Sequence, residues 1–108
     1  MDITVNELKE RIDNGTAPIM IDVREPFEWQ MDHLPQVEKI SLRDLANPTT
    51  LDKMAGRKEM EIVLICRSGG RSGRATNFLK SKGFVKARNL KGGMLAWKTY
   101  IDPKFNVM

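Results

Sequence analysis

The only cysteine of the chain, Cys66, stands where residue types and spacing favour a nucleophilic sulfur. It ends the apolar run 62–65 and is followed by Arg67, two glycines and Arg71. A cysteine attacks as its thiolate, which is favoured by nearby arginines, by inward-facing backbone N–H groups and by the positive end of a helix dipole. The sequence therefore predicts a lowered pKa and a reactive sulfur at Cys66. The alternative interpretation, that Cys66 is only a small buried hydrophobic residue, is less favoured.

The loop after Cys66 has the composition of an anion-binding nest. Gly69 and Gly70 can adopt backbone conformations that are closed to other residues, so the loop N–H groups can turn toward the sulfur. Such a cradle would hold a thiolate or an anionic group carried on it. We therefore expect Cys66 to be the catalytic residue. The expected substrate-binding residues are Arg67, Ser68, Gly69, Gly70, Arg71 and Ser72.

Two buried strands are expected to position this loop. Segments 61–65 and 18–24, the second of which changes from apolar to charged residues at Asp22, both have the pattern of strands that are covered on two faces. Because the carboxyl ends of parallel strands meet at one edge of a sheet, the polar end of the second strand would lie beside the loop. Asp22, Arg24 and Glu25 are thus expected to support the loop, with Asp22 or Glu25 pairing with a loop arginine or accepting loop N–H groups.

The remaining segments complete an alternating pattern of strands and helices. We expect further strands near residues 2–3, 37–42 and 84–87, with helices after Thr4, after Pro26, after the Cys66 loop and after Gly92, and short helices near Leu45 and Leu51. Alternation of this kind is typical of a parallel sheet. The sequence predicts an α/β fold, with a central parallel sheet of about five strands and helices on both faces, in a single domain over residues 1–108.

Composition and charge limit the classes of function. The longest wholly apolar run has five residues, which excludes a membrane span, and the first residues lack the pattern of a signal peptide, so a cytoplasmic location is expected. Residues 1–65 carry a net charge of −5 and residues 66–108 one of +9. The basic half could steer a small anion or an acidic protein partner toward Cys66, or be only a solvated surface. Nucleic-acid binding is not expected, because packing explains the aromatic residues.

His33 is the only histidine and hence the obvious candidate for a general base. A thiolate that its own loop stabilises needs no base, so we expect His33 to form structural hydrogen bonds instead. One histidine and one cysteine do not make a closed metal site, and no metal is expected. With no second thiol in the chain, sulfur chemistry at Cys66 must finish on another molecule.

Four motifs resemble, in order and spacing, those of the single-domain rhodanese-like sulfurtransferase family. They are Asp-Val-Arg-Glu at 22–25, His-Leu-Pro at 33–35, Cys-Arg-Ser-Gly-Gly-Arg-Ser at 66–72 and Leu-Lys-Gly-Gly-Met-Leu-Ala-Trp at 90–97. The resemblance covers nearly the whole chain and implies a rhodanese-like fold. In one place it fails: the family commonly has a small Gly-Ala pair where this chain has Gln36-Val37, so the local turn is expected to differ.

The resemblance implies a thiosulfate or persulfide sulfurtransferase with ping-pong kinetics. Cys66 would accept sulfane sulfur from thiosulfate or a persulfide donor and pass it to cyanide, a thiol or a protein cysteine. The transient persulfide would need no cofactor. The loop backbone would hold this persulfide, Arg67 and Arg71 would attract the anionic donor, and His33 and Trp97 would be structural.

Two alternatives remain beside this reading. One is a protein-interaction or sulfur-relay module with little turnover of small molecules, which the basic half of the chain favours equally. The other is a phosphatase or arsenate reductase of related fold. That family's loop has five residues between cysteine and arginine, whereas four separate Cys66 from Arg71, and the shorter loop favours the smaller sulfur group.

Overall fold

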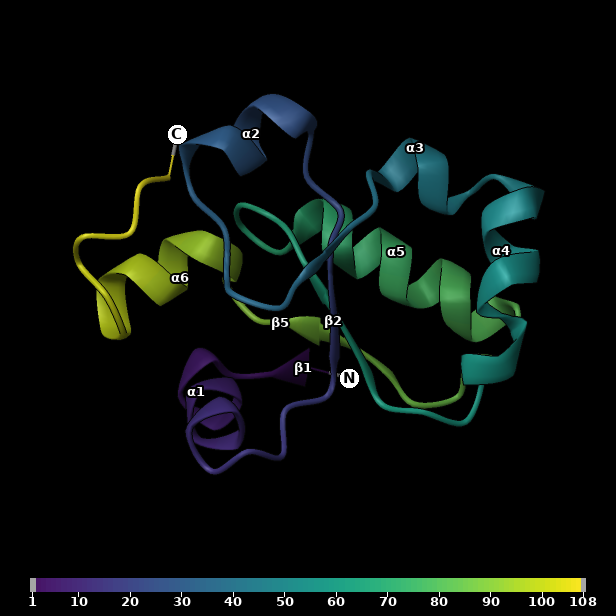
Figure 1. The fold of residues 1–108 in the computed structure, drawn as a ribbon, viewed down its shortest axis with the longest axis horizontal. Coiled ribbons are helices and arrows are strands. Elements are labelled where there is room, and N and C mark those ends of the chain that lie inside the picture. The colour runs from purple at the N-terminus through teal and green to yellow at the C-terminus, as the bar shows by residue number, and fades with distance from the viewer. Residues whose placement is uncertain (1, 108) are drawn as a thin grey trace.

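Five parallel strands form the centre of the molecule, and helices cover both faces of the sheet (Figure 1). The computed structural model describes residues 2–107. The strands are β1 (Asp2–Ile3), β2 (Ile19–Asp22), β3 (Glu38–Lys39), β4 (Ile62–Ile65) and β5 (Ala87–Leu90), in the sheet order β1-β5-β4-β2-β3. The helices are α1 (Val5–Asp13), α2 (Pro26–Met31), α3 (Leu42–Leu45), α4 (Pro48–Met54), η1 (Ala55–Arg57), α5 (Gly70–Ser81) and α6 (Gly93–Tyr100). The predicted fold class is confirmed.

Alternating side chains of the central strands divide the core in two. On β4, Val63 and Ile65 pack with the face that α1 and α6 cover, while Ile62 and Leu64 pack with the face that α3, α4 and α5 cover. All four are at most 1% exposed. A strand that is buried on both faces must be apolar throughout, which is why the run reads as it does in the sequence.

The strand predicted at 84–87 is wrong. Phe84 lies after the end of α5, where its N–H donates to the Leu79 carbonyl at 3.0 Å, and Val85 is exposed. The observed strand is β5, which pairs in parallel with both β1 and β4. Its two middle residues, Arg88 and Asn89, are polar, so no apolar run marks it in the sequence.

The edge of the sheet is shorter than predicted. The strand expected over 37–42 is only β3, and Ser41 instead begins α3 by accepting a hydrogen bond from the Asp44 N–H. An edge strand has a neighbour on one side only, so fewer backbone bonds hold it extended. The helices expected after Thr4 and after Pro26 are both present, and the first begins with a capping box between Thr4 and Glu7.

Strand register places the polar end of β2 beside the end of β4. Asp22 lies opposite Ile65, and the Val23 N–H donates to the Ile65 carbonyl at 2.8 Å. Segment 22–25 and the Cys66 loop therefore leave the sheet at the same edge, as the parallel arrangement predicts.

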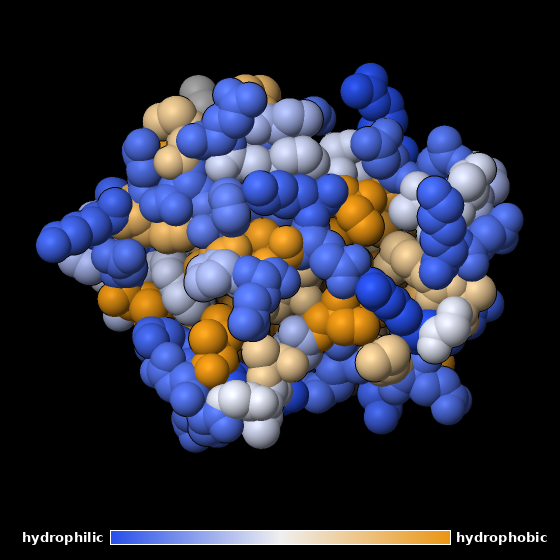
Figure 2. Space-filling view, viewed as in Figure 1, coloured by the Kyte–Doolittle hydropathy of each residue, from blue (hydrophilic) through white to orange (hydrophobic). Residues whose placement is uncertain are grey.

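The surface seen in Figure 2 is largely hydrophilic, with apolar patches toward the middle of the face. The larger exposed apolar side chains include Phe27 and Met31, which stand one helical turn apart on α2. Within residues 2–107, no helix is both long enough and apolar enough to cross a membrane.

Candidate active site

Cys66 follows β4 directly and is 1% exposed. Its Sγ accepts hydrogen bonds from the Gly69 N–H at 3.1 Å and from the Ser72 hydroxyl at 3.2 Å. Gly69 has a φ of +102°, in the left-handed region that favours glycine, and this turn starts α5 with its N-terminus close to the sulfur. Gly70 is not among the residues of positive φ, so of the two loop glycines only Gly69 uses a conformation that other residues rarely adopt.

Two opposed effects set the acidity of the thiol. Burial raises the pKa of Cys66, because it penalises the charged thiolate. Hydrogen bonds from the Ser72 hydroxyl and from the N–H groups of Ser72, Gly69 and Ser68 lower it. The hydrogen bonds prevail, and the pKa of Cys66 lies below its ordinary value, in the direction that the sequence predicts.

Asn89 of β5 contacts both residues that donate hydrogen bonds to the Cys66 sulfur. Its Oδ1 accepts from the buried Ser72 hydroxyl at 2.5 Å, and its Nδ2 donates to the Gly69 carbonyl at 3.2 Å. The Ser72 hydroxyl has one proton, which it can give either to Asn89 or to Sγ. Asn89 lies outside the strand predicted at 84–87, because the observed strand β5 begins three residues later. The sequence therefore did not point to Asn89 as a site residue.

The start of α6 holds the loop from the other side. The Met94 and Leu95 N–H groups donate to the carbonyls of Cys66 and Arg67, both at 2.9 Å. Gly93 makes this approach possible: its φ is +58°, and a Cβ there would overlap the Cys66 carbonyl oxygen. The Gly-Gly pair of motif 90–97 was the available signal for this contact, but the sequence alone did not show that it faces Cys66.

Arg71 lies at the loop but is paired by a residue that the sequence analysis did not select. Its two terminal nitrogens donate to the two carboxylate oxygens of Glu28 at 2.6 and 2.9 Å. Arg71 therefore pairs with Glu28 and not with Asp22 or Glu25. Glu25 acts on Glu28 instead, by donating its N–H to Oε1 at 3.1 Å. The three-residue spacing from Glu25 to Glu28, typical of a capping box, was the signal to use.

Asp22 and Arg24 form a buried ion pair with each other. Their side chains are each 1% exposed, and Nη2 of Arg24 lies 2.8 Å from Oδ2 of Asp22. The same guanidinium donates to the Asp32 carbonyl at 2.8 Å. This pair fixes the turn that follows β2, so its position fits the support expected of Asp22 and Arg24.

The exposed part of the loop is formed by Arg67, Ser68 and Gly70. Of the predicted stretch 66–72, Ser68, Gly69 and Ser72 supply donors to the sulfur, and Arg71 interacts with it electrostatically.

The other residues singled out in the sequence lie elsewhere. A ring nitrogen of His33, Nδ1, is 3.0 Å from the Leu34 carbonyl, and Trp97 is part of the core beside α1. Gln36-Val37 stands where the chain departs from the family's common Gly-Ala pair. Gln36 has a φ of +64°, so the turn there has a left-handed conformation without a glycine. Over the described range 2–107, no three metal-ligating side chains cluster.

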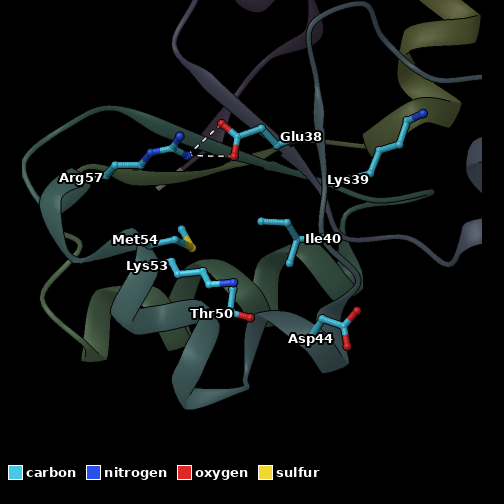
Figure 3. Close-up of a pocket in the computed structure, with 8 residues that line it drawn as sticks. All are labelled: Glu38, Lys39, Ile40, Asp44, Thr50, Lys53, Met54 and Arg57. Atoms are coloured by element: carbon cyan, nitrogen blue, oxygen red, sulfur yellow. Dashed lines mark hydrogen bonds and ion pairs between the residues drawn. The ribbon is translucent and has the colours of Figure 1, made fainter.

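A pocket of about 430 Å³ opens at the β3 edge of the sheet (Figure 3). Ile40 and Met54 point toward each other across it, and Arg57 donates to both carboxylate oxygens of Glu38 at 2.8 Å. No residue of the Cys66 loop lines this pocket. The hollow belongs to the packing of α3 and α4 against the sheet edge and not to the cysteine site.

Comparison with known proteins gives one consistent family. Residues 4–100 match the Rhodanese-like domain. The chain is 38% identical over 104 residues to "Putative sulfurtransferase YtwF" of Bacillus subtilis, covering 95% of each. It is 34% identical to "Probable adenylyltransferase/sulfurtransferase MoeZ" of Mycobacterium tuberculosis, covering 94% of this chain but only 25% of that relative.

Solved structures agree with the sequence comparisons. A Staphylococcus saprophyticus protein, SSP1007, superposes with a TM-score of 0.75 at 34% identity, covering 86% of this chain and 88% of that one. A rhodanese-like domain protein from Staphylococcus aureus gives a TM-score of 0.77 at 27% identity, covering 100% and 99%.

Proposed function

The chain belongs to the rhodanese-like domain family, and from this membership and the geometry at Cys66 we propose that it is a sulfurtransferase whose Cys66 carries sulfane sulfur as a persulfide. The family's relatives include proteins named as sulfurtransferases, one of them matched over nearly its full length. The proposed donor is thiosulfate or another persulfide, and the acceptor is cyanide, a thiol or a protein cysteine.

One observation carries the proposal: a buried sulfur that accepts an N–H and a hydroxyl at the N-terminus of a twelve-residue helix. These donors favour a thiolate, which is the attacking species, and the same donors would stabilise the negative charge of a persulfide. Four residues separate Cys66 from Arg71, and the loop closes so tightly that Gly69 touches the sulfur. A cradle of this size suits one added sulfur atom.

The proposed reaction has two halves. In the first, the Cys66 thiolate attacks the outer sulfur of thiosulfate; a new S–S bond forms, the S–S bond of the donor breaks, and sulfite leaves with its electron pair. In the second, the acceptor attacks the outer sulfur of the persulfide, and the electron pair of the broken bond returns to Cys66. The Gly69 N–H and the Ser72 hydroxyl, which donate to Sγ of the free cysteine, would be the donors available to the charged sulfur in both halves.

The test is the intact mass of the protein after incubation with thiosulfate and removal of excess donor. We expect a gain of one sulfur, lost again on treatment with cyanide, and no gain in Cys66→Ser. Sulfur transfer retained by the serine variant would refute the mechanism. A wild-type chain that thiosulfate does not load would exclude thiosulfate as donor.

A second function, sulfur relay to a protein, is favoured by two observations. The MoeZ relative and an "Adenylyltransferase and sulfurtransferase uba4" of Ogataea parapolymorpha match this chain over about a quarter of their own length. In this chain, α2 carries exposed Phe27 and Met31 on the helix whose Glu28 holds Arg71. For relay, persulfide loading by a protein donor should be faster than loading by thiosulfate, and Phe27→Ser should slow only the protein-dependent step.

A further inference from the structure

The positive charge of Arg71 is matched by a buried carboxylate at the mouth of the cysteine loop. Glu28 lies on α2, above the start of α5 in Figure 1, and its side chain is 7% exposed. Both terminal nitrogens of Arg71 are taken up by the two Glu28 oxygens. Two parallel charge-assisted bonds of this kind fix the guanidinium in direction as well as in charge. Arg71 is therefore not presented to an incoming anion as an unmatched cation.

The charge state of the pair is stable under ordinary conditions. Hydrogen bonding to Arg71 lowers the pKa of Glu28, and hydrogen bonding to Glu28 raises the pKa of Arg71. Both groups thus stay ionised near neutral pH. The negative charges that act on Arg71 are Glu28 first, then the Cys66 sulfur and Glu25. A dianionic donor that approaches Cys66 meets this carboxylate next to the arginine that would attract it.

We propose that Glu28 is a specificity-determining residue, which offsets the charge of Arg71 and so reduces the preference of the Cys66 site for strongly charged donors such as thiosulfate over donors of lower charge. This inference rests on the proposed sulfurtransferase function. It adds to that function which class of sulfur donor, by charge, the Cys66 site prefers. Glu28 acts through Arg71 and through its field, and it makes no contact with the sulfur in the structure as described.

The proposal predicts an effect that grows with the charge of the donor. Coulomb energy is proportional to the product of the charges, so removing one negative charge helps a dianion twice as much, in free energy, as a monoanion. For charges about 6 Å apart, screened as in bulk water, we expect roughly a tenfold gain in kcat/KM for thiosulfate and about a threefold gain for a monoanion. The gain should shrink as salt screens the field.

Glu28→Gln is the variant that isolates the charge. Its amide oxygen can still accept from one terminal nitrogen of Arg71 and from the Glu25 N–H, while the amide nitrogen cannot accept the second Arg71 bond. Glu28→Gln therefore keeps the size of the side chain and removes its charge. Loading of Cys66 is measured with thiosulfate and with methanethiosulfonate, which carries one negative charge less and also presents an outer sulfur to the thiolate. Any change in the reactivity of Cys66 itself multiplies both rates equally and cancels in their ratio.

Two controls separate charge from structure. Glu61→Gln makes the same change in a second bidentate pair, with Arg11 at 2.8 and 3.2 Å, at the opposite end of β4 from Cys66. It should leave the donor ratio unchanged. Glu28→Asp keeps the charge, and its donor ratio should remain near that of the wild type.

A ratio of thiosulfate to methanethiosulfonate that rises about threefold in Glu28→Gln, and returns to the wild-type value at 1 M salt, supports the proposal. An unchanged ratio, with both donors still loading Cys66, overturns it and leaves the sulfurtransferase function intact. A wild-type chain that neither donor loads would overturn small-molecule sulfur transfer and this inference together.

Discussion

Replacing Ser72 by alanine should weaken the acidity of Cys66 without disturbing the fold. Ser72 is fully buried, and its hydroxyl lies 3.2 Å from Sγ and 2.5 Å from Oδ1 of Asn89. When the sulfur is ionised, its full charge makes it a strong competitor for the single hydroxyl proton. Loss of that donor removes stabilisation from the thiolate and not from the neutral thiol, so the pKa of Cys66 should rise.

The size of the effect follows from the competition for the proton. A hydrogen bond to a charged group contributes about 1.5–3 kcal/mol. Because Asn89 offers an alternative acceptor to the same hydroxyl, we take the lower end, about 1.5 kcal/mol, which is about a tenfold decrease in the acid dissociation constant. At a pH below the pKa of Cys66, the rate of sulfur loading should therefore fall about tenfold, while at high pH it should approach the wild-type rate.

The assay is the pH dependence of alkylation of Cys66 by iodoacetamide, supported by thiolate absorbance. Ser81→Ala is the matched control, since Ser81 is on the same helix and its hydroxyl donates to the Phe78 carbonyl, away from the sulfur. The titration midpoint should move upward only in Ser72→Ala. If the two variants titrate alike, the hydroxyl does not stabilise the thiolate and the reasoning is refuted.

Three further changes are tested by urea unfolding. Gly93→Ala should lower the free energy of unfolding by more than about 3 kcal/mol, because its methyl group would overlap the Cys66 carbonyl; Gly56→Ala, whose methyl meets open space, should leave it nearly unchanged. Arg24→Met should cost about 3–5 kcal/mol by leaving Asp22 buried and unpaired, and apolar replacement of both should recover part of that loss. Gln36→Gly should add roughly 0.5–1 kcal/mol by relieving a left-handed φ of +64°, and a loss of stability would contradict this account.

Much of the fold can be read from the sequence because its signals are local. The run at β4 is apolar throughout and that at β2 is apolar up to Asp22, Thr4 and Pro26 mark helix starts, and Cys66 stands at the carboxyl end of a buried strand. Each of these depends on neighbours within a few residues, so periodicity and capping residues suffice. The expectation that Cys66, its glycine turn and the start of a helix act as one unit follows from the same local pattern.

Only the tertiary structure decided which distant residues complete the site. Glu28 reaches Arg71 across 43 positions, Asn89 reaches Ser72 across 17, and Gly93 meets the Cys66 carbonyl from a separate helix. The strand that carries Asn89 owes its conformation to pairing with β1 and β4 and not to its own polar sequence. The sequence by itself determined where the Cys66 sulfur lies, since its strand and its loop are contiguous. The donors to that sulfur come from the same loop, whereas the carboxylate that pairs with Arg71 and the amide that holds Ser72 come from residues that only the folded sheet brings together.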